Sequence, residues 1–139
     1  MDTRLIFLPA MAMVALTCVV WWRMYVMRIG QMKRERIHPQ AVATSAQSAA
    51  PLTDSCAAHN FRNLFELPVL FYLALVVAAV FGLATPTAMG LAWAFVALRV
   101  VHSVVHCSYN RVMHRFVVYV AGALVLWALW ACLAIGLMR

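Results

Sequence analysis

Two short stretches carry most of the side chains that can do chemistry inside otherwise apolar sequence. The first reads HNFRNLFELP and runs from His59 to Pro68. Helical spacing places His59, Asn63 and Glu66 on one stripe, with Arg62 beside it. A carboxylate a turn or more inside an apolar segment is costly unless it finds a partner or a water-filled cavity. We therefore expect Glu66 to face the interior of the protein.

Pro68 affects the same stretch because it lacks a backbone N–H and crowds the carbonyl of Leu64. A helix through this region is expected to bend where Glu66 lies, and a carbonyl freed there can bind water or a ligand. The alternative for Glu66 is a simple pair with Arg62, four residues earlier, that caps the helix at the membrane interface.

The second stretch begins at Arg99, and helical spacing places Arg99, His102, Ser103 and His106 on one face. Arg99 stays charged and needs a carboxylate, and Glu66 is the only acid in any apolar segment. We therefore predict that these two residues lie close together across the interface between the second and third helices. The two histidines could offer nitrogens to one metal or haem iron. Without a third ligand on the stripe, buried histidines bonded to neighbouring helices are the favoured interpretation, with no metal site.

A basic segment follows, with Arg111, His114 and Arg115 close together. These side chains could hold an anion. Attraction to anionic lipid explains the same charges without a specific ligand, so both interpretations stay open.

The composition indicates what surrounds these residues. Of the 139 residues, 66% are hydrophobic and only 11% are charged, which is more apolar surface than a water-soluble core of this size can hide. Lipid must therefore be the solvent. The net charge of +7 comes mostly from residues that flank apolar segments, so it indicates membrane topology and no nucleic-acid partner.

Charge-free runs predict an all-α integral membrane bundle of four helices in a single domain. A run from Leu67 to Leu98 is too long for one crossing, and Gly82 and Pro86 predict a tight hairpin within it. A cleaved signal peptide is the competing interpretation of the first run, but the run is long for one and ends in Trp21, Trp22 and Arg23. The predicted spans are approximately 4–28, 60–83, 87–109 and 115–138, with an irregular loop at 30–58.

The distribution of Lys and Arg predicts the orientation of these spans. Arg4 and Arg139 lie at one side, and the other side collects many more basic residues. These are Arg23, Arg28, Lys33, Arg34, Arg36, Arg62, Arg111 and Arg115. The first and third loops are therefore expected to face the cytoplasm, with both termini and the hairpin opposite.

With its four spans in this order, the chain resembles the MAPEG family, the membrane-associated proteins in eicosanoid and glutathione metabolism. The motif from His59 to Pro68 and the stretch from Arg99 to Arg115 carry the likeness. It is closest to bacterial members, which implies the bacterial inner membrane. It also implies a homotrimer of four-helix subunits that binds glutathione at subunit interfaces near the cytoplasmic side.

The resemblance assigns expected roles residue by residue. In the family motif an Arg is followed by Asn four residues later and Glu three after that. Asn63 and Glu66 match, but His59 stands at the Arg position and Arg62 is a candidate substitute. Arg99 matches a family arginine.

Two further positions depart from the family pattern. His102 and His106 replace tyrosines that are usual in eicosanoid-type members. Arg111 and Arg115 are the candidates for the catalytic arginine that stabilises a bound thiolate. The candidates for glutathione binding are His59, Arg62, Asn63, Glu66, Arg99, His102 and His106.

Three functions follow from these observations. The first is a glutathione-dependent transferase or peroxidase that acts on lipophilic small molecules reaching it from the membrane. The second is a non-catalytic membrane protein whose polar residues hold helices and subunits together. Metal or haem binding through His102 and His106 is the third.

Overall fold

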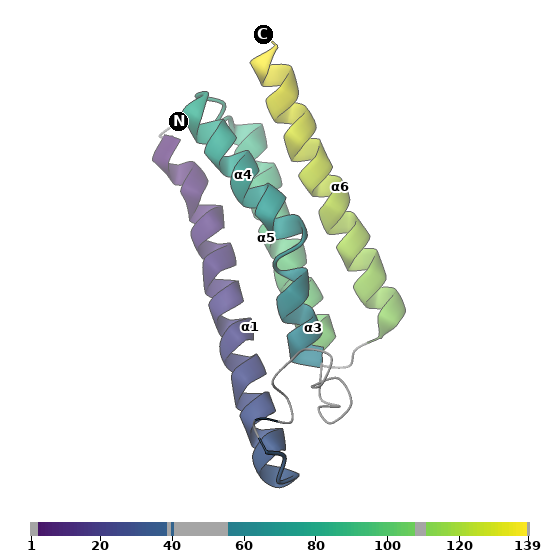
Figure 1. Cartoon of the computed structure of the whole chain (residues 1–139). Coiled ribbons are helices and arrows are strands. Elements are labelled where there is room, and N and C mark those ends of the chain that lie inside the picture. Colours follow the sequence, from purple (N-terminus) through teal and green to yellow (C-terminus); the bar gives the residue numbers. More distant parts are fainter. Residues whose placement is uncertain (1–2, 39, 41–55, 108–110, 139) are drawn as a thin grey trace.

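The described residues form four helical segments that are long and apolar enough to cross a membrane, the second made of two consecutive helices, so the predicted all-α membrane bundle is confirmed. The structure is a computed structural model that describes residues 3–38, 40, 56–107 and 111–138. The predicted irregular loop between 41 and 55 lies outside the described residues. The elements, shown in Figure 1, are the 3-10 turn η1 (Thr3–Ile6), α1 (Phe7–Arg34), α3 (Cys56–Asn63), α4 (Leu67–Val80), α5 (Pro86–Cys107) and α6 (Val112–Leu137).

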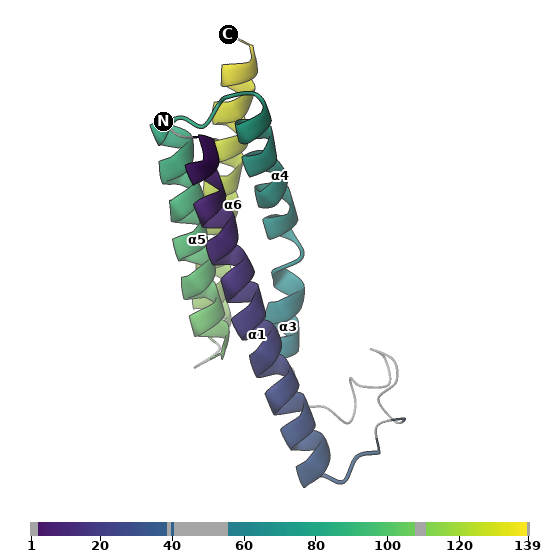
Figure 2. The ribbon, with the colours of Figure 1, turned by 90° about the vertical axis from the view of Figure 1, so that its left-hand side faces the viewer.

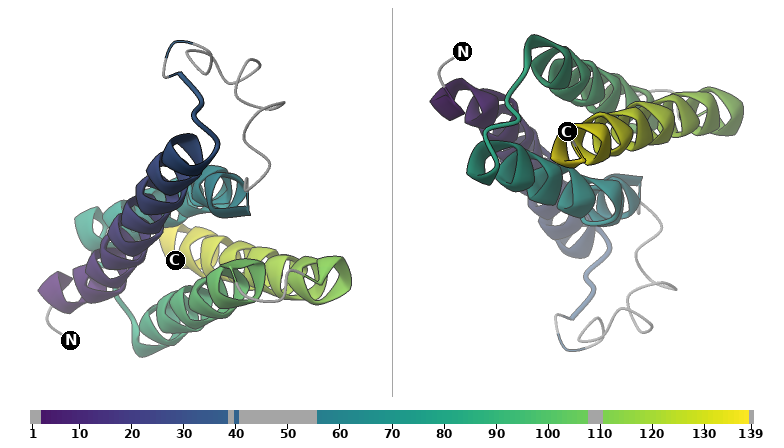
Figure 3. Two further views of the ribbon diagram at one scale, coloured as in Figure 1. Left: turned by 90° about the horizontal axis from the view of Figure 1, so that it is seen from below. Right: turned by 90° about the horizontal axis from the view of Figure 1, so that it is seen from above.

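The helices run up and down, so the N-terminus, the α4–α5 turn and the C-terminus gather at one end of the bundle (Figure 1). The start of α3, the end of α5 and the start of α6 lie at the other end. Seen along the bundle, α1 and the α3–α4 segment occupy one side and α5 and α6 the other (Figure 3). The contact between α5 and α6 is the most extensive one. Residues early in α6 are therefore brought beside residues late in α5.

The hairpin between α4 and α5 is built by local signals. Gly82 has φ +67°, the left-handed conformation that ends many helices, and the N–H of Leu83 donates to the carbonyl of Ala78 at 2.8 Å. Thr85 then caps α5, because its Oγ1 accepts the N–H of Ala88 at 3.1 Å. These caps end α4 at Val80, slightly before the approximate end that the sequence indicated, and start α5 at Pro86.

The second crossing is broken at the position where the sequence predicted a bend. α3 ends at Asn63, and α4 begins at Leu67 with Pro68 in its first turn. Glu66 between them has φ −92° and ψ −97°, far from helical values. Because Pro68 has no N–H to donate to the carbonyl of Leu64, the helix ladder stops there. Figure 2 shows the resulting gap between the two ribbons.

α1 is longer than the sequence indicated. The loop was expected to begin at Gly30, but the helix continues to Arg34. A single glycine is tolerated within a helix, and the Gln31 side chain amide donates to both carboxylate oxygens of Glu35 at 3.0 and 3.2 Å. α1 therefore extends past the rest of the bundle (Figure 2).

The centre of the bundle packs through one aromatic pair and several alanines. The Phe71 and Phe95 rings stack with centroids 4.6 Å apart, and both side chains are fully buried. Ala74, Ala78 and Ala92 are fully buried as well, and such small side chains let membrane helices approach closely. This core fixes the position of α5, which carries the second polar stripe.

The aromatic pair makes a testable contribution to stability. Phe71→Ala would leave a cavity in a packed core, so we expect it to lower the free energy of unfolding by about 3 kcal/mol. The measurement is the thermal midpoint of the detergent-purified protein. Phe81→Ala is the matched control, because Phe81 is 60% exposed and its removal leaves no cavity. Equal midpoints for the two variants would contradict the assignment of the core.

Candidate functional site

Arg99 in α5 is a charged side chain buried in an apolar bundle. It is 2% exposed, and none of its three guanidinium nitrogens has a hydrogen-bond partner in the part of the chain that the structure describes. Burial of a charge without a partner is strongly unfavourable, and charged residues inside membrane spans usually mark functional positions. Arg99 is therefore the centre of the candidate site.

Tyr119 of α6 lies between the two residues that the sequence predicted to be close. The Arg99 Cζ lies 5.2 Å from the centroid of the Tyr119 ring and 5.4 Å from that of Phe95. The Tyr119 hydroxyl donates to Oε2 of Glu66 at 3.2 Å. The Arg99 guanidinium thus lies against two aromatic rings, and the Glu66 carboxylate accepts a hydrogen bond from the hydroxyl of one of them, Tyr119.

Glu66 and Arg99 therefore meet at the same tyrosine, but no direct ion pair joins them in the described part of the chain. Among the described residues, the Arg99 guanidinium has no hydrogen-bond partner, and Glu66 is exposed instead of facing the interior as the sequence predicted. The break between α3 and α4 explains the difference. It takes Glu66 out of helical register, so its carboxylate reaches α6 and not α5.

The two histidines of α5 are buried as the stripe indicated. His102 and His106 are each 2% exposed, and their ring centroids lie 5.8 Å apart. Nη1 of Arg115 lies 3.2 Å from Nε2 of His106. A guanidinium can only donate, so Nε2 accepts, and the neutral ring carries its proton on Nδ1. That Nδ1 and both nitrogens of His102 have no hydrogen-bond partner.

A further pair ties α3 to this group. The hydroxyl of Ser103 donates to Oδ1 of Asn60 at 3.4 Å, and Asn60 is fully buried. We call the whole assembly the polar cluster. It consists of Asn60, Glu66, Arg99, His102, Ser103, His106, Arg115 and Tyr119.

The other residues singled out from the sequence lie at the edge of the polar cluster. His59 and Arg62 are exposed on α3, and Asn63 is partly buried. Arg111 is exposed at the N-cap of α6, so the structure brings Arg115, and not Arg111, against a histidine. Among the described residues, no set of three or more His, Cys, Asp or Glu side chains is arranged to hold a metal ion.

Sequence reasoning missed Tyr119. Its signal was present, because Tyr119 is the only hydroxyl-bearing residue between Phe116 and Met138 and lies four positions after Arg115. That spacing places the two side chains on the same face of a helix. Their ring and guanidinium contacts with α5 confirm that this face meets the polar stripe.

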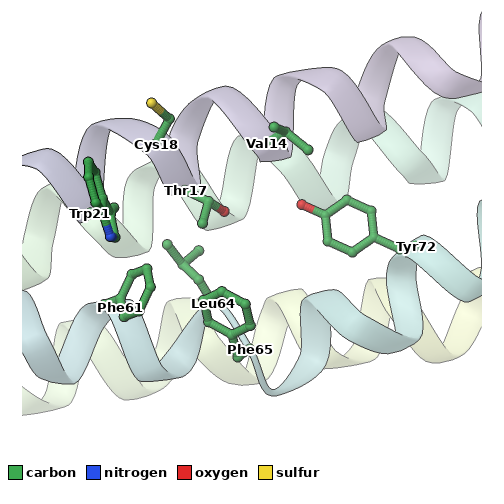
Figure 4. Close-up of a pocket in the computed structure, with 8 residues that line it drawn as sticks. All are labelled: Val14, Thr17, Cys18, Trp21, Phe61, Leu64, Phe65 and Tyr72. Carbon is green, nitrogen blue, oxygen red and sulfur yellow. The ribbon is translucent and has the colours of Figure 1, made fainter.

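An apolar pocket of about 440 Å³ lies between α1 and the α3–α4 segment (Figure 4). It reaches Leu64 and Phe65, immediately before Glu66 in the chain. Tyr72 directs its hydroxyl toward Thr17 across the pocket (Figure 4). The lining residues are Val14, Thr17, Cys18, Trp21, Phe61, Leu64, Phe65 and Tyr72. An apolar molecule dissolved in the bilayer fits such a lining.

The comparison with known proteins agrees with this architecture. The family model described as MAPEG family matches residues 6–135, which is nearly the whole chain and includes every member of the polar cluster. No match was found among curated proteins or among solved structures.

Because Arg99 is charged and buried, we expect its replacement by an uncharged residue to stabilise the protein. Arg99→Met keeps a side chain of similar length and removes a buried charge, so we expect stability to rise by about 1 kcal/mol or more, despite the loss of two ring contacts. The measurement is the thermal midpoint in detergent without added ligand. Arg99→Lys keeps the charge and serves as the control, with no gain expected. A lower midpoint for Arg99→Met would mean that the bundle stabilises the guanidinium.

Proposed function

The chain belongs to the MAPEG family, and on that premise we propose that it is a glutathione-dependent transferase or peroxidase acting on lipophilic electrophiles. The observation that carries the proposal is the buried Arg99 guanidinium without a hydrogen-bond partner, beside histidine nitrogens that also have none. A ligand that forms hydrogen bonds to such buried polar groups removes the free-energy cost of leaving them without partners.

Glutathione has the chemistry that these groups require. It offers two carboxylates and peptide carbonyls as acceptors, and the polar cluster offers the donors of Arg99 and the Nδ1–H of His106. The ammonium and peptide N–H groups of the ligand can donate to Glu66 and to a nitrogen of His102. His59, Arg62 and Asn63 at the nearby edge of α3 would hold the outer part of the tripeptide.

The reactive group would be the thiolate of glutathione, and Arg115 would stabilise it. A neighbouring cation lowers the pKa of a thiol and raises the fraction present as nucleophile. Arg115 lies in the first turn of α6 and is held by His106 at 3.2 Å. Arg111, one turn earlier and exposed, would supply further positive potential. In the transferase reaction, sulfur forms a bond to an electrophilic carbon while the leaving group departs with the bonding electrons.

The second substrate would come from the bilayer through the apolar pocket between α1 and the α3–α4 segment. The pocket is formed by the part of α1 from Val14 to Trp21, within the apolar span. Its opposite wall runs from Phe61 to Tyr72 and includes Phe65, next to Glu66 of the polar cluster. A lipophilic electrophile there lies beside the helix break that also positions the polar groups.

Assembly into a homotrimer is part of the proposal, and Glu66 supports it. This carboxylate is exposed in the single subunit although it belongs to a membrane-spanning segment. An ionised side chain is expensive against lipid, so a neighbouring subunit that covers Glu66 and the exposed Arg62 would remove that cost.

The alternative function is a non-catalytic membrane protein whose polar cluster serves helix packing. Two observations favour it, the Ser103–Asn60 bond between α5 and α3 and the Tyr119–Glu66 bond from α6. Such interhelical bonds contribute to membrane protein stability. Under this alternative, Glu66→Gln lowers detergent stability, and no variant of the polar cluster alters any response to glutathione.

Isothermal titration calorimetry with reduced glutathione tests the proposed function. We expect saturable heat for the wild-type protein at millimolar ligand and at least tenfold weaker binding for Arg99→Met, because a charge-assisted bond to a carboxylate is lost. Arg28→Gln is the matched control, since it removes a cation of α1 outside the polar cluster. An absence of heat for the wild-type protein would overturn the proposal.

Substrate kinetics with 1-chloro-2,4-dinitrobenzene test the apolar pocket. Val14→Trp places a large ring at the pocket lining, so we expect the KM for this electrophile to rise about tenfold while the KM for glutathione stays unchanged. Val19→Trp is the matched control, because Val19 is 65% exposed and does not line the pocket. Equal KM values for both variants would contradict a role of the pocket in the reaction.

A further inference from the structure

The end of α1 is built differently from the rest of the bundle. With 28 residues, α1 is about 42 Å long, whereas the hydrocarbon core of a bilayer spans about 30 Å. Trp21, Trp22 and Tyr25 form an aromatic group of the kind that marks a membrane interface, and the Trp21 and Tyr25 rings contact each other at 4.8 Å. The last turns of α1 therefore lie at the depth of lipid headgroups, beyond the other helices (Figure 2).

A hollow of about 550 Å³ is present at this end of α1. Apolar and basic side chains both line it. Its lining consists of Ile29, Met32, Lys33, Arg36, Ile37 and His38. The first four of these are spaced three, one and three residues apart, which places them along one face of the helix and its final turn.

The chain returns across the hollow through a defined helix end. The N–H of Ile37 donates to the carbonyl of Met32 at 3.0 Å, and Arg36 has φ +54°, the left-handed conformation that usually favours glycine. This turn brings Ile37 back toward Met32, and both side chains line the hollow together with Ile29. It also places Arg36 at the rim together with Lys33.

The charged residues that line the hollow are Lys33 and Arg36, and its described lining contains no acidic residue. Glu35 is the nearest acid in sequence, and it contacts residues outside the hollow, with Arg34 at 3.6 Å and Gln31 at 3.0 Å. At His38, Nδ1 accepts the backbone N–H of Gln40 at 3.3 Å, so a neutral ring presents Nε2–H as a donor. The hollow therefore combines cationic donors with an apolar floor.

We propose that this hollow binds the headgroup of an anionic phospholipid. The phosphate would bond to Lys33 and Arg36, and the glycerol and upper acyl carbons would pack on Ile29, Met32 and Ile37. Juxtamembrane cations attract anionic lipid in general, but a floor of three apolar side chains adds contacts that only an amphiphile can use. A free phosphate ion would gain nothing from that floor. The site is independent of the polar cluster.

Native mass spectrometry of the full chain, released from detergent with added lipid, tests this proposal. The probes are palmitoyl-oleoyl phosphatidylglycerol and palmitoyl-oleoyl phosphatidylcholine, which share acyl chains and differ in headgroup charge. We expect saturable phosphatidylglycerol adducts that are at least fivefold more abundant than phosphatidylcholine adducts. The double variant Lys33→Gln/Arg36→Gln is expected to lose this preference.

Two controls separate a built site from general attraction. Arg28→Gln/Arg34→Gln removes the same charge from the same helix outside the hollow and is expected to keep the preference. Lys33→Arg/Arg36→Lys keeps the charges and is expected to retain binding. Equal loss in both Gln double variants would overturn the proposal in favour of diffuse attraction. Full competition by inorganic phosphate would overturn it in favour of a simple anion site.

Discussion

The buried positive charge of Arg99 is the constraint on which the rest of the polar cluster depends. Lipid cannot solvate it, and the bundle gives its guanidinium aromatic faces in place of hydrogen-bond acceptors. Tyr119 serves two purposes, because its ring contacts Arg99 while its hydroxyl bonds to Glu66. The acid is thus coupled to the base through a third side chain. An arrangement of this kind leaves the donors of Arg99 available to a ligand, which a direct ion pair would not.

The break between α3 and α4 makes this arrangement possible. In a continuous helix, Glu66 would continue the stripe of His59 and Asn63 toward α5. Because Pro68 stops the ladder after Leu64, the backbone at Glu66 leaves helical geometry, and the carboxylate meets α6. One proline therefore decides which helix the acid contacts. The same break lies within the wall of the apolar pocket, which Phe65 lines before it and Tyr72 after it, so the polar and apolar parts of the candidate site meet at one feature of the backbone.

Much of the architecture could be predicted because it depends on local sequence. Charge-free runs, with Gly82 and Pro86 between two of them, specify the four crossings, and the spacing of Arg99, His102 and His106 specifies a buried stripe. The partner of Glu66 could not be predicted, because it depends on rotation of the chain after the break. Tyr119 was missed although its spacing from Arg115 was a signal, because the sequence does not show which face of α6 meets the polar stripe of α5.

The extent of α1 was also underestimated. Gly30 and the basic residues after it are typical of a helix end, whereas the bonds between Gln31 and Glu35 extend the helix to Arg34. The chain therefore has one cationic region at the end of α1, around Lys33, and another in the polar cluster, around Arg99. The two regions differ in how deeply the charges are buried. Lys33 is exposed, so its charge is screened by water and suits a headgroup at the bilayer surface. Arg99 is buried, so its charge is screened less than an exposed charge would be. A ligand there would have to supply hydrogen-bond acceptors that replace the lost hydration of the guanidinium. Depth in the bundle therefore distinguishes the two cationic regions more than the number of their charges does.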